Sequence, residues 1–170
     1  MTFAAASVNP KARAVELDYY IRNIESVLRN DARARTPEAD VLSAFTLAAE
    51  SAGRTGNVVL IDSGLGTKGG NDFRRQIDFL ENPSRSVSYL QKTHVRPDLR
   101  GRNVLFIGLG FVAPPQPQLD NRLRDNTRAI WSKIAQIAGA ACVSVDEYPN
   151  TQDAVAGVPP VSIVRARRSG

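Results

Sequence analysis

The chain has 170 residues, of which 42% are hydrophobic and 23% charged. This composition is typical of a globular domain that can bury a full core. No apolar stretch approaches the roughly 20 residues of a membrane span. The net charge of +5 comes from scattered arginines and a basic C-terminal end; no basic run is interleaved with aromatic residues, so nucleic-acid binding is not indicated. The single cysteine, Cys142, excludes an intramolecular disulfide, and its apolar surroundings predict a buried, inert thiol.

The N-terminal part predicts a short strand followed by a helix. Residues 2–8 are small and apolar, and they end at the turn signal Asn9-Pro10. They lack the charged flank and long apolar core of a signal peptide, so we expect a soluble domain that stays where it is made. Helical spacing then predicts a helix over residues 12–30. Its apolar positions are Leu17, Tyr20, Ile21, Ile24, Val27 and Leu28.

A second helix is predicted after Thr36. This threonine precedes Pro37 and an acidic first turn, which favours Thr36 as the N-cap. Gly53 is expected to end the helix. The buried stripe is predicted to consist of Val41, Ala44, Phe45 and Ala48.

The middle of the chain predicts one strand and one or two helices. The run Asn57–Asp62 is rich in β-branched residues, which predicts a strand covered on both faces of a parallel sheet. Residues 72–80 are typical of a short helix or an edge strand. A further helix is expected from about Asn82 to about His94, with Val87 and Leu90 facing inward.

The same pattern recurs towards the C-terminus. A strand is predicted within 102–108 and another at 141–146, with a helix between them that ends at Gly139. Beyond residue 149 the chain is rich in Pro, Gly, Ala and Arg, which is typical of a tail or linker, although 161–164 is compatible with an edge strand. The apolar face of the helix comprises Leu123, Thr127, Ile130, Trp131, Ile134, Ile137 and Ala138.

Alternating strands and helices predict a doubly wound α/β domain over residues 1–148, with a mainly parallel sheet and helices on both faces, followed by a tail over 149–170. Ligands of such folds bind at the carboxyl ends of the strands. The loops 62–70 and 108–116 are expected at that edge. This arrangement is Rossmann-like.

The first of these loops contains Gly64, Gly66 and Gly69 in the spacing G-x-G-x-x-G, which suggests an alternative function as a nucleotide-binding Rossmann-type enzyme. No helix opens inside the motif, and no strand-end acid follows about 20 residues later. The other interpretation is that these glycines only shape a long loop. In the second loop, prolines after Gly110 remove N–H groups that a phosphate would need.

Asp62 and Ser63 end the clearest strand, where their oxygens offer weak ligands for a divalent cation. The alternative is that both side chains cap the following turn. His94 is the only histidine, and no serine or cysteine is linked to it by a recognisable motif, so no catalytic triad is predicted. No cofactor is expected, and Mg²⁺ should bind no more tightly than millimolar.

Taken in order, several segments resemble a von Willebrand factor A-like domain of the kind found in actinobacterial OmpA-family proteins. The segments are 36–44 (TPEADVLSA), 58–67 (VVLIDSGLGT), 97–101 (PDLRG), 104–110 (VLFIGLG) and 113–119 (APPQPQL). The resemblance implies a ligand-binding module rather than an enzyme, in a parent protein associated with the cell envelope. The adhesion-site motif D-x-S-x-S of that family is absent.

The sequence therefore favours a non-catalytic protein-interaction module that presents its strand-end loops to a protein partner. No catalytic residue is assigned, and the metal ligands are at most Asp62 and Ser63. The expected contact residues are Asp62, Ser63, Gly64, Thr67, Lys68, Gly110 and Gln116.

Overall fold

The computed structural model describes residues 9–30, 36–93, 96–146 and 164–165, and it divides the chain into one unit over residues 1–35 and another over 36–170. In the first unit, helix α1 (Pro10–Asn30) begins directly after Asn9. The Asn9 side chain accepts a hydrogen bond from the N–H of Lys11 (3.0 Å), which explains this start. The predicted helix is confirmed, whereas the strand expected at 2–8 lies outside the described residues.

The second unit is built on a parallel sheet of three strands, β1 (Asn57–Ile61), β2 (Asn103–Ile107) and β3 (Cys142–Asp146). The strands lie in the order β1-β2-β3, and the pairing brings Val58 opposite Val104 and Val104 opposite Val143. The predicted parallel α/β class is confirmed. The finer assignment, Rossmann-like or von Willebrand A-like, stays a prediction.

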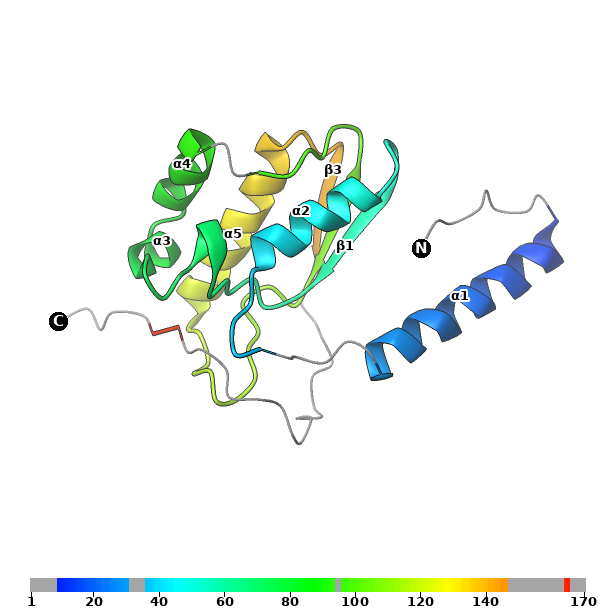
Figure 1. Cartoon of the computed structure of the whole chain (residues 1–170), viewed down its shortest axis with the longest axis horizontal. Coiled ribbons are helices and arrows are strands. Elements are labelled where there is room, and N and C mark those ends of the chain that lie inside the picture. Colours follow the sequence, from blue (N-terminus) through cyan, green and yellow to red (C-terminus); the bar gives the residue numbers. More distant parts are fainter. Residues whose placement is uncertain (1–8, 31–35, 94–95, 147–163, 166–170) are drawn as a thin grey trace. The chain divides into compact units, whose positions relative to one another are not determined.

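The helices of this unit lie on one face of the sheet, the face that carries the buried side chains of Val58, Val104 and Phe106. Figure 1 shows the helices and strands with their labels. Right-handed crossovers between strands that follow one another in order place every connecting helix on the same face. The ring of Phe45 on the helix before β1 lies 5.4 Å from that of Phe106 on β2 and 5.8 Å from that of Trp131, so this helix shares the face. The elements are α2 (Val41–Ser51), the 3₁₀ turn η1 (Gly69–Asn71), α3 (Ile77–Glu81), α4 (Pro83–Thr93) and α5 (Asn121–Ile137).

The predictions that helices cover both faces of the sheet and that β1 is buried on both faces are therefore wrong for the described residues of this unit. Val58 is 3% exposed, whereas its neighbour Val59 is 49% exposed and Ile61 is 54% exposed. Side chains alternate along a strand, so one set enters the core and the other faces away from it. Cys142 lies at the start of the edge strand β3 and is also exposed, which corrects the expectation of a buried thiol.

Helix α2 begins later than predicted. Its N-cap is Asp40, whose carboxylate accepts a hydrogen bond from the N–H of Ser43 (3.0 Å), while the hydroxyl of Thr36 donates to the carbonyl of Glu38 (2.9 Å). The buried face also differs from the predicted one, because Ala44 is exposed and Ala48 only half-buried. The residues buried instead are Val41, Leu42, Phe45 and Ala49.

Trp131 lies at the centre of the core, as the sequence predicts. Its side chain is 0% exposed and packs against the rings of Phe45 and Phe106. The predicted inward residues of α4, Val87 and Leu90, are buried as well. Within the described ranges, none of the helices has the length and apolar character needed to cross a bilayer.

Candidate functional site

The carboxyl ends of the three strands meet at one edge, where backbone hydrogen bonds join their loops. The N–H of Asp62 donates to the carbonyl of Ile107 (3.1 Å), and the N–H of Gly108 donates to that of Asp146 (3.3 Å). One step further, the N–H of Gly110 donates to the carbonyl of Ser63 (2.8 Å). The two loops that the sequence singles out are therefore neighbours.

The loop after β1 is folded into the protein rather than held out from it. Gly64 and Thr67 are buried, and Leu65 between them is only 6% exposed. Lys68 and Gly69 are the exposed residues of this stretch. Most of this loop is therefore not presented at the surface, because Leu65 joins the apolar core.

Two of the glycines are explained by close packing. Gly64 has φ +75°, and a Cβ there would lie 2.5 Å from Nε1 of Trp131. A Cβ on Gly66 would lie 2.4 Å from the carbonyl oxygen of Asn71. Both positions exclude a side chain for reasons internal to the fold.

The G-x-G-x-x-G segment does not form a phosphate cradle. Such a cradle needs free N–H groups aimed at the ligand from the start of a helix, but four consecutive N–H groups here donate within the protein, and η1 spans only three residues. This weighs against the nucleotide-binding alternative. The donations run from Gly64 to Asp62 Oδ1, from Leu65 to Ser63 Oγ, from Gly66 to the carbonyl of Gly64 and from Thr67 to the carbonyl of Ala39.

Asp62 and Ser63 form the turn that the second interpretation of their sequence predicts. Both are half-buried, and Asp62 Oδ1 accepts the N–H of Gly64 at 2.7 Å. Burial raises the pKa of the Asp62 carboxyl, although the hydrogen bonds from Gly64 and Ser63 oppose this shift. The described residues hold no group of three or more His, Cys, Asp or Glu side chains suited to a metal.

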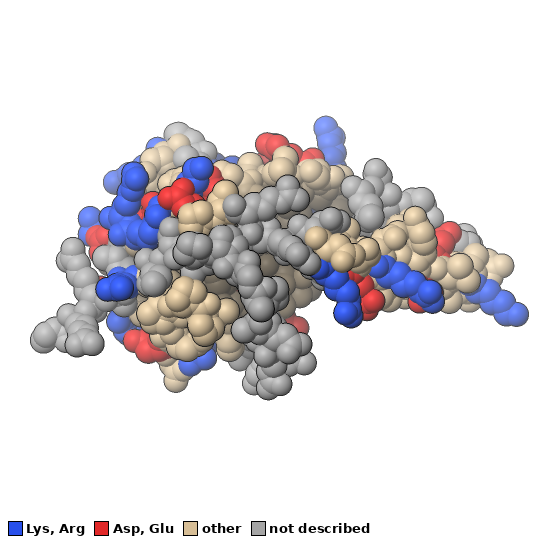
Figure 2. All heavy atoms as spheres, turned by 60° about the horizontal axis from the view of Figure 1, so that its bottom comes forward, with Lys and Arg blue, Asp and Glu red and all other residues tan. Residues whose placement is uncertain are grey.

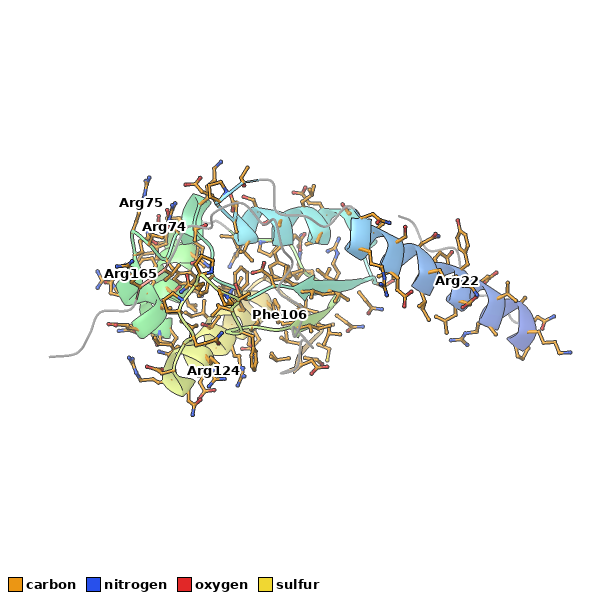
Figure 3. All side chains as sticks on the ribbon, turned by 90° about the horizontal axis from the view of Figure 1, so that it is seen from below. Arg22, Arg74, Arg75, Phe106, Arg124 and Arg165 are labelled. Atoms are coloured by element: carbon orange, nitrogen blue, oxygen red, sulfur yellow. The ribbon has the colours of Figure 1, made fainter. Side chains whose placement is uncertain are left out.

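An ionic cluster around Arg74, which the sequence does not reveal, fixes the far end of this loop. Figure 3 labels Arg74 and its neighbour Arg75. Its guanidinium contacts Asp72 (3.0 Å) and Glu38 (3.1 Å), and it also donates to the carbonyl of Thr67. Burial opposes ionisation of Asp72, but the hydrogen bonds and charge of Arg74, with the charge of Arg75, outweigh it and lower the Asp72 pKa. Glu38 and Arg74 are 36 residues apart, so no local pattern predicts their pairing.

The loop after β2 is anchored through Gln116. Its amide Nε2 donates to the carbonyl of Val164 (2.7 Å), and its Oε1 accepts the N–H of Val164 (2.8 Å). Val164, within the predicted tail, is 2% exposed, while residues 147–163 lie outside the described part of the chain. Gln116 is half-buried and Gly110 is buried, so both support the loop from within.

The tip of this loop is exposed and held at its base. Gln118 Nε2 donates to the carbonyl of Val112 (2.6 Å), which closes the tip. Phe111 lies beneath two guanidinium groups of α5, those of Arg124 at 5.6 Å and Arg128 at 5.8 Å from the ring centroid. The exposed residues of the tip are Ala113, Pro114, Pro115, Pro117 and Gln118.

Comparison with known proteins adds no relative: no family model, no curated protein and no solved structure matches the chain. The structure itself defines an α/β domain with a three-stranded parallel sheet and two interlocked loops at its carboxyl edge. His94 lies outside the described residues. On the face that Figure 2 shows, acidic side chains lie among the basic ones.

Proposed function

We propose that the second unit is a non-catalytic, von Willebrand A-like protein-interaction module that binds a protein partner through its carboxyl edge. The contact surface is the loop tip 112–118 together with exposed Lys68. The resemblance of its segments to envelope-associated proteins favours a parent protein of that kind.

The observation that carries this proposal is the combination of an exposed tip with a fixed base. Loops that present residues to a partner bind best when the scaffold already holds them in shape, because less conformational freedom is lost on binding. Here Gln116 ties the loop to Val164, and Gln118 closes it onto Val112. Exposed prolines between these anchors add apolar area to a stiff backbone.

The proposal narrows the set of contact residues. Gly64, Thr67 and Gly110 are buried, so in this proposal they shape the edge rather than meet the partner. Asp62 and Ser63 use their oxygens to cap the turn at the base of the edge. Lys68 remains as a direct contact, and Gln116 acts by holding the tip.

Site-specific photo-crosslinking tests the surface. A photoreactive amino acid replaces Pro115 at the tip, and in a matched control it replaces Lys133, which is exposed on α5. We expect one partner to be crosslinked from position 115, and excess unlabelled chain to suppress that product. Position 133 should give no such product.

A second variant separates binding from folding. Gln116→Ala removes both hydrogen bonds to Val164, so the tip should lose its anchor and the crosslink from position 115 should weaken. Thermal unfolding of the same variant reports whether the core remains intact. Equal crosslinking from positions 115 and 133, or undiminished crosslinking in a folded Gln116→Ala chain, would contradict the proposed surface.

A further inference from the structure

Helix α1 carries an apolar stripe that is exposed along most of its length. Leu17 is 58% exposed, Ile21 47% and Ile24 44%. In the view of Figure 2, uncharged side chains run along this helix beside charged ones. Helices in proteins gain most of their stability by burying such a face against another element. We therefore expect this stripe to be buried against another surface.

The spacing of the stripe indicates what kind of surface that is. Ala14, Leu17, Ile21 and Ile24 follow one another at intervals of three, four and three residues. This 3.5-residue repeat corresponds to positions a and d of a heptad, the seam by which two helices pack in a coiled coil. Tyr20 and Val27 follow at position g beside this seam and widen its apolar face.

The charges beside the seam favour a parallel pair. With Ala14 and Ile21 at position a, Arg13 falls at position g and Asp18 at the following position e. In a parallel coiled coil these positions of the two helices face each other, so Arg13 of one copy meets Asp18 of the other. An antiparallel pair would instead bring Asp18 near Glu25, and like charges repel.

We propose that α1 is a self-association helix, which pairs in parallel with α1 of a second copy of this chain through Leu17, Ile21 and Ile24. Asp18 also forms an exposed ion pair with Arg22 of its own helix (2.8 Å). The inference concerns the first unit alone and does not depend on the function proposed for the second.

Sedimentation equilibrium of the full chain tests the pairing. We expect the average mass to rise with concentration from 18.5 kDa towards twice that value, with a dissociation constant of about 100 µM because only two heptads contribute. Ile21→Glu places a charge in the seam and should weaken association at least about tenfold. Val15→Glu adds the same charge at a residue that is 71% exposed and outside the seam, so it should leave association unchanged.

Two further variants and a control keep the test specific if Ile21→Glu simply unfolds the helix. Arg13→Glu opposes Asp18 of the other copy and should weaken pairing, and adding Asp18→Lys should restore it. Arg29→Glu makes the same charge change outside the seam and serves as the control.

Disulfide formation tests whether the two α1 helices pair in parallel. In a Cys142→Ser background, Ala14→Cys should form an intermolecular disulfide rapidly, because the same a position of two parallel helices lies within disulfide reach. A chain that stays monomeric at about 500 µM would overturn the proposal. A dimer that persists in Ile21→Glu would also overturn it. The same holds for a chain that stays monomeric and binds anionic phosphatidylglycerol vesicles through α1. A dimer in which Ala14→Cys fails to crosslink would overturn the parallel arrangement.

Discussion

Gly64 lies directly against the indole of Trp131, and this contact joins the loop after β1 to the middle of α5. The indole Nε1–H donates to the carbonyl of Gly64 at 2.9 Å. Because Trp131 is fully buried, its N–H needs such a partner within the protein. Gly64 thus lets the backbone approach the indole closely, adopts a positive φ, and offers its carbonyl as the acceptor for the indole N–H.

Gly64→Ala should destabilise the protein by more than about 2 kcal/mol, because it adds a strained positive φ and a methyl group against the indole. Urea unfolding followed by tryptophan fluorescence measures this loss. Gly53→Ala is the matched control: a Cβ there meets nothing within 4 Å. We expect it to be neutral or stabilising by up to about 1 kcal/mol. Equal stability of the two variants would contradict the packing described here.

The carboxyl groups of Asp62 and Asp72 should give opposite pH dependences. Burial raises the pKa of Asp62 above its ordinary 3.8, so the folded state holds this proton more tightly and loses stability as the pH rises from 3.8 through the raised value. Asp62→Asn removes that loss, and its free energy of unfolding should therefore gain on the wild type between about pH 3 and pH 7.

Asp72 provides the contrast. Its folded-state pKa is lowered, so its stabilisation is present above 3.8 and disappears as the pH falls through the lowered value. Asp72→Asn should accordingly lose stability relative to the wild type as the pH rises. Chemical unfolding of both variants across this range is the measurement. Parallel curves for the two variants would show that the environments of these carboxyl groups are misassigned.

For single residues, the sequence predicts those features that depend on neighbouring positions in the chain. Trp131 is correctly placed in the core, because its position on an amphipathic helix follows from the spacing of neighbouring apolar residues. The burial of Gly64 and the Arg74–Glu38 pair depend on contacts between residues that are 67 and 36 positions apart. Nothing in the spacing of nearby residues reveals such contacts.

Among the elements, α2 shows how a helix start is chosen between two competing caps. Thr36 before Pro37 has the residue types of a helix start, but the helix begins at Val41 with Asp40 as its cap. Thr67 explains the delay, because its hydroxyl accepts the N–H of Ala39 (2.8 Å) and its N–H donates to the carbonyl of Ala39 (2.8 Å). These two bonds hold the preceding segment out of helical geometry.

Asp40→Ala should therefore destabilise the protein by about 0.5–2 kcal/mol, the usual effect of losing an N-cap. Thr36→Ala removes only a local bond to the carbonyl of Glu38 and should change the free energy of unfolding by less than about 0.5 kcal/mol. Thermal or urea unfolding distinguishes the two. A larger effect at Thr36 than at Asp40 would favour the helix start that the sequence predicts.

The strands and helices themselves are largely predictable, whereas the coverage of the sheet is not. The short apolar runs of β1 and β2 and the helical periodicity of α5 are clear in the sequence, and each of these three predicted elements is present. The strand order β1-β2-β3 is set by which edges pair, a long-range choice that leaves no mark within a single strand. The hydrophobic run of β1 indicates a strand covered on both faces. Because the three strands follow one another in sequence order, however, the helices of the second unit all lie on one face of the sheet.

At the scale of the whole molecule, the helices of the two units differ in the exposure of their apolar side chains. Helix α5 is built into the core, with Ile130, Trp131 and Ile134 each 0% exposed. Helix α1 forms its own unit and leaves its apolar stripe exposed. Local opening has a small free-energy cost where few apolar contacts are lost. We therefore expect the free energy of opening to be lower for α1 than for α5.

Hydrogen exchange should therefore depend on chain concentration in one helix and not in the other. At about 5 µM, the amides of α1 should exchange through local opening, while those of α5 exchange only through global unfolding. At about 500 µM, pairing of α1 with a second copy should slow its exchange, because ligation stabilises the closed state by mass action. The amides of α5 should be unaffected. Mass spectrometry of peptides from 10–30 and 121–137 reads both helices in one experiment, and Ile21→Glu should abolish the concentration dependence. If α1 exchanges as slowly as α5 at the lowest concentration, its apolar stripe is covered without a second copy.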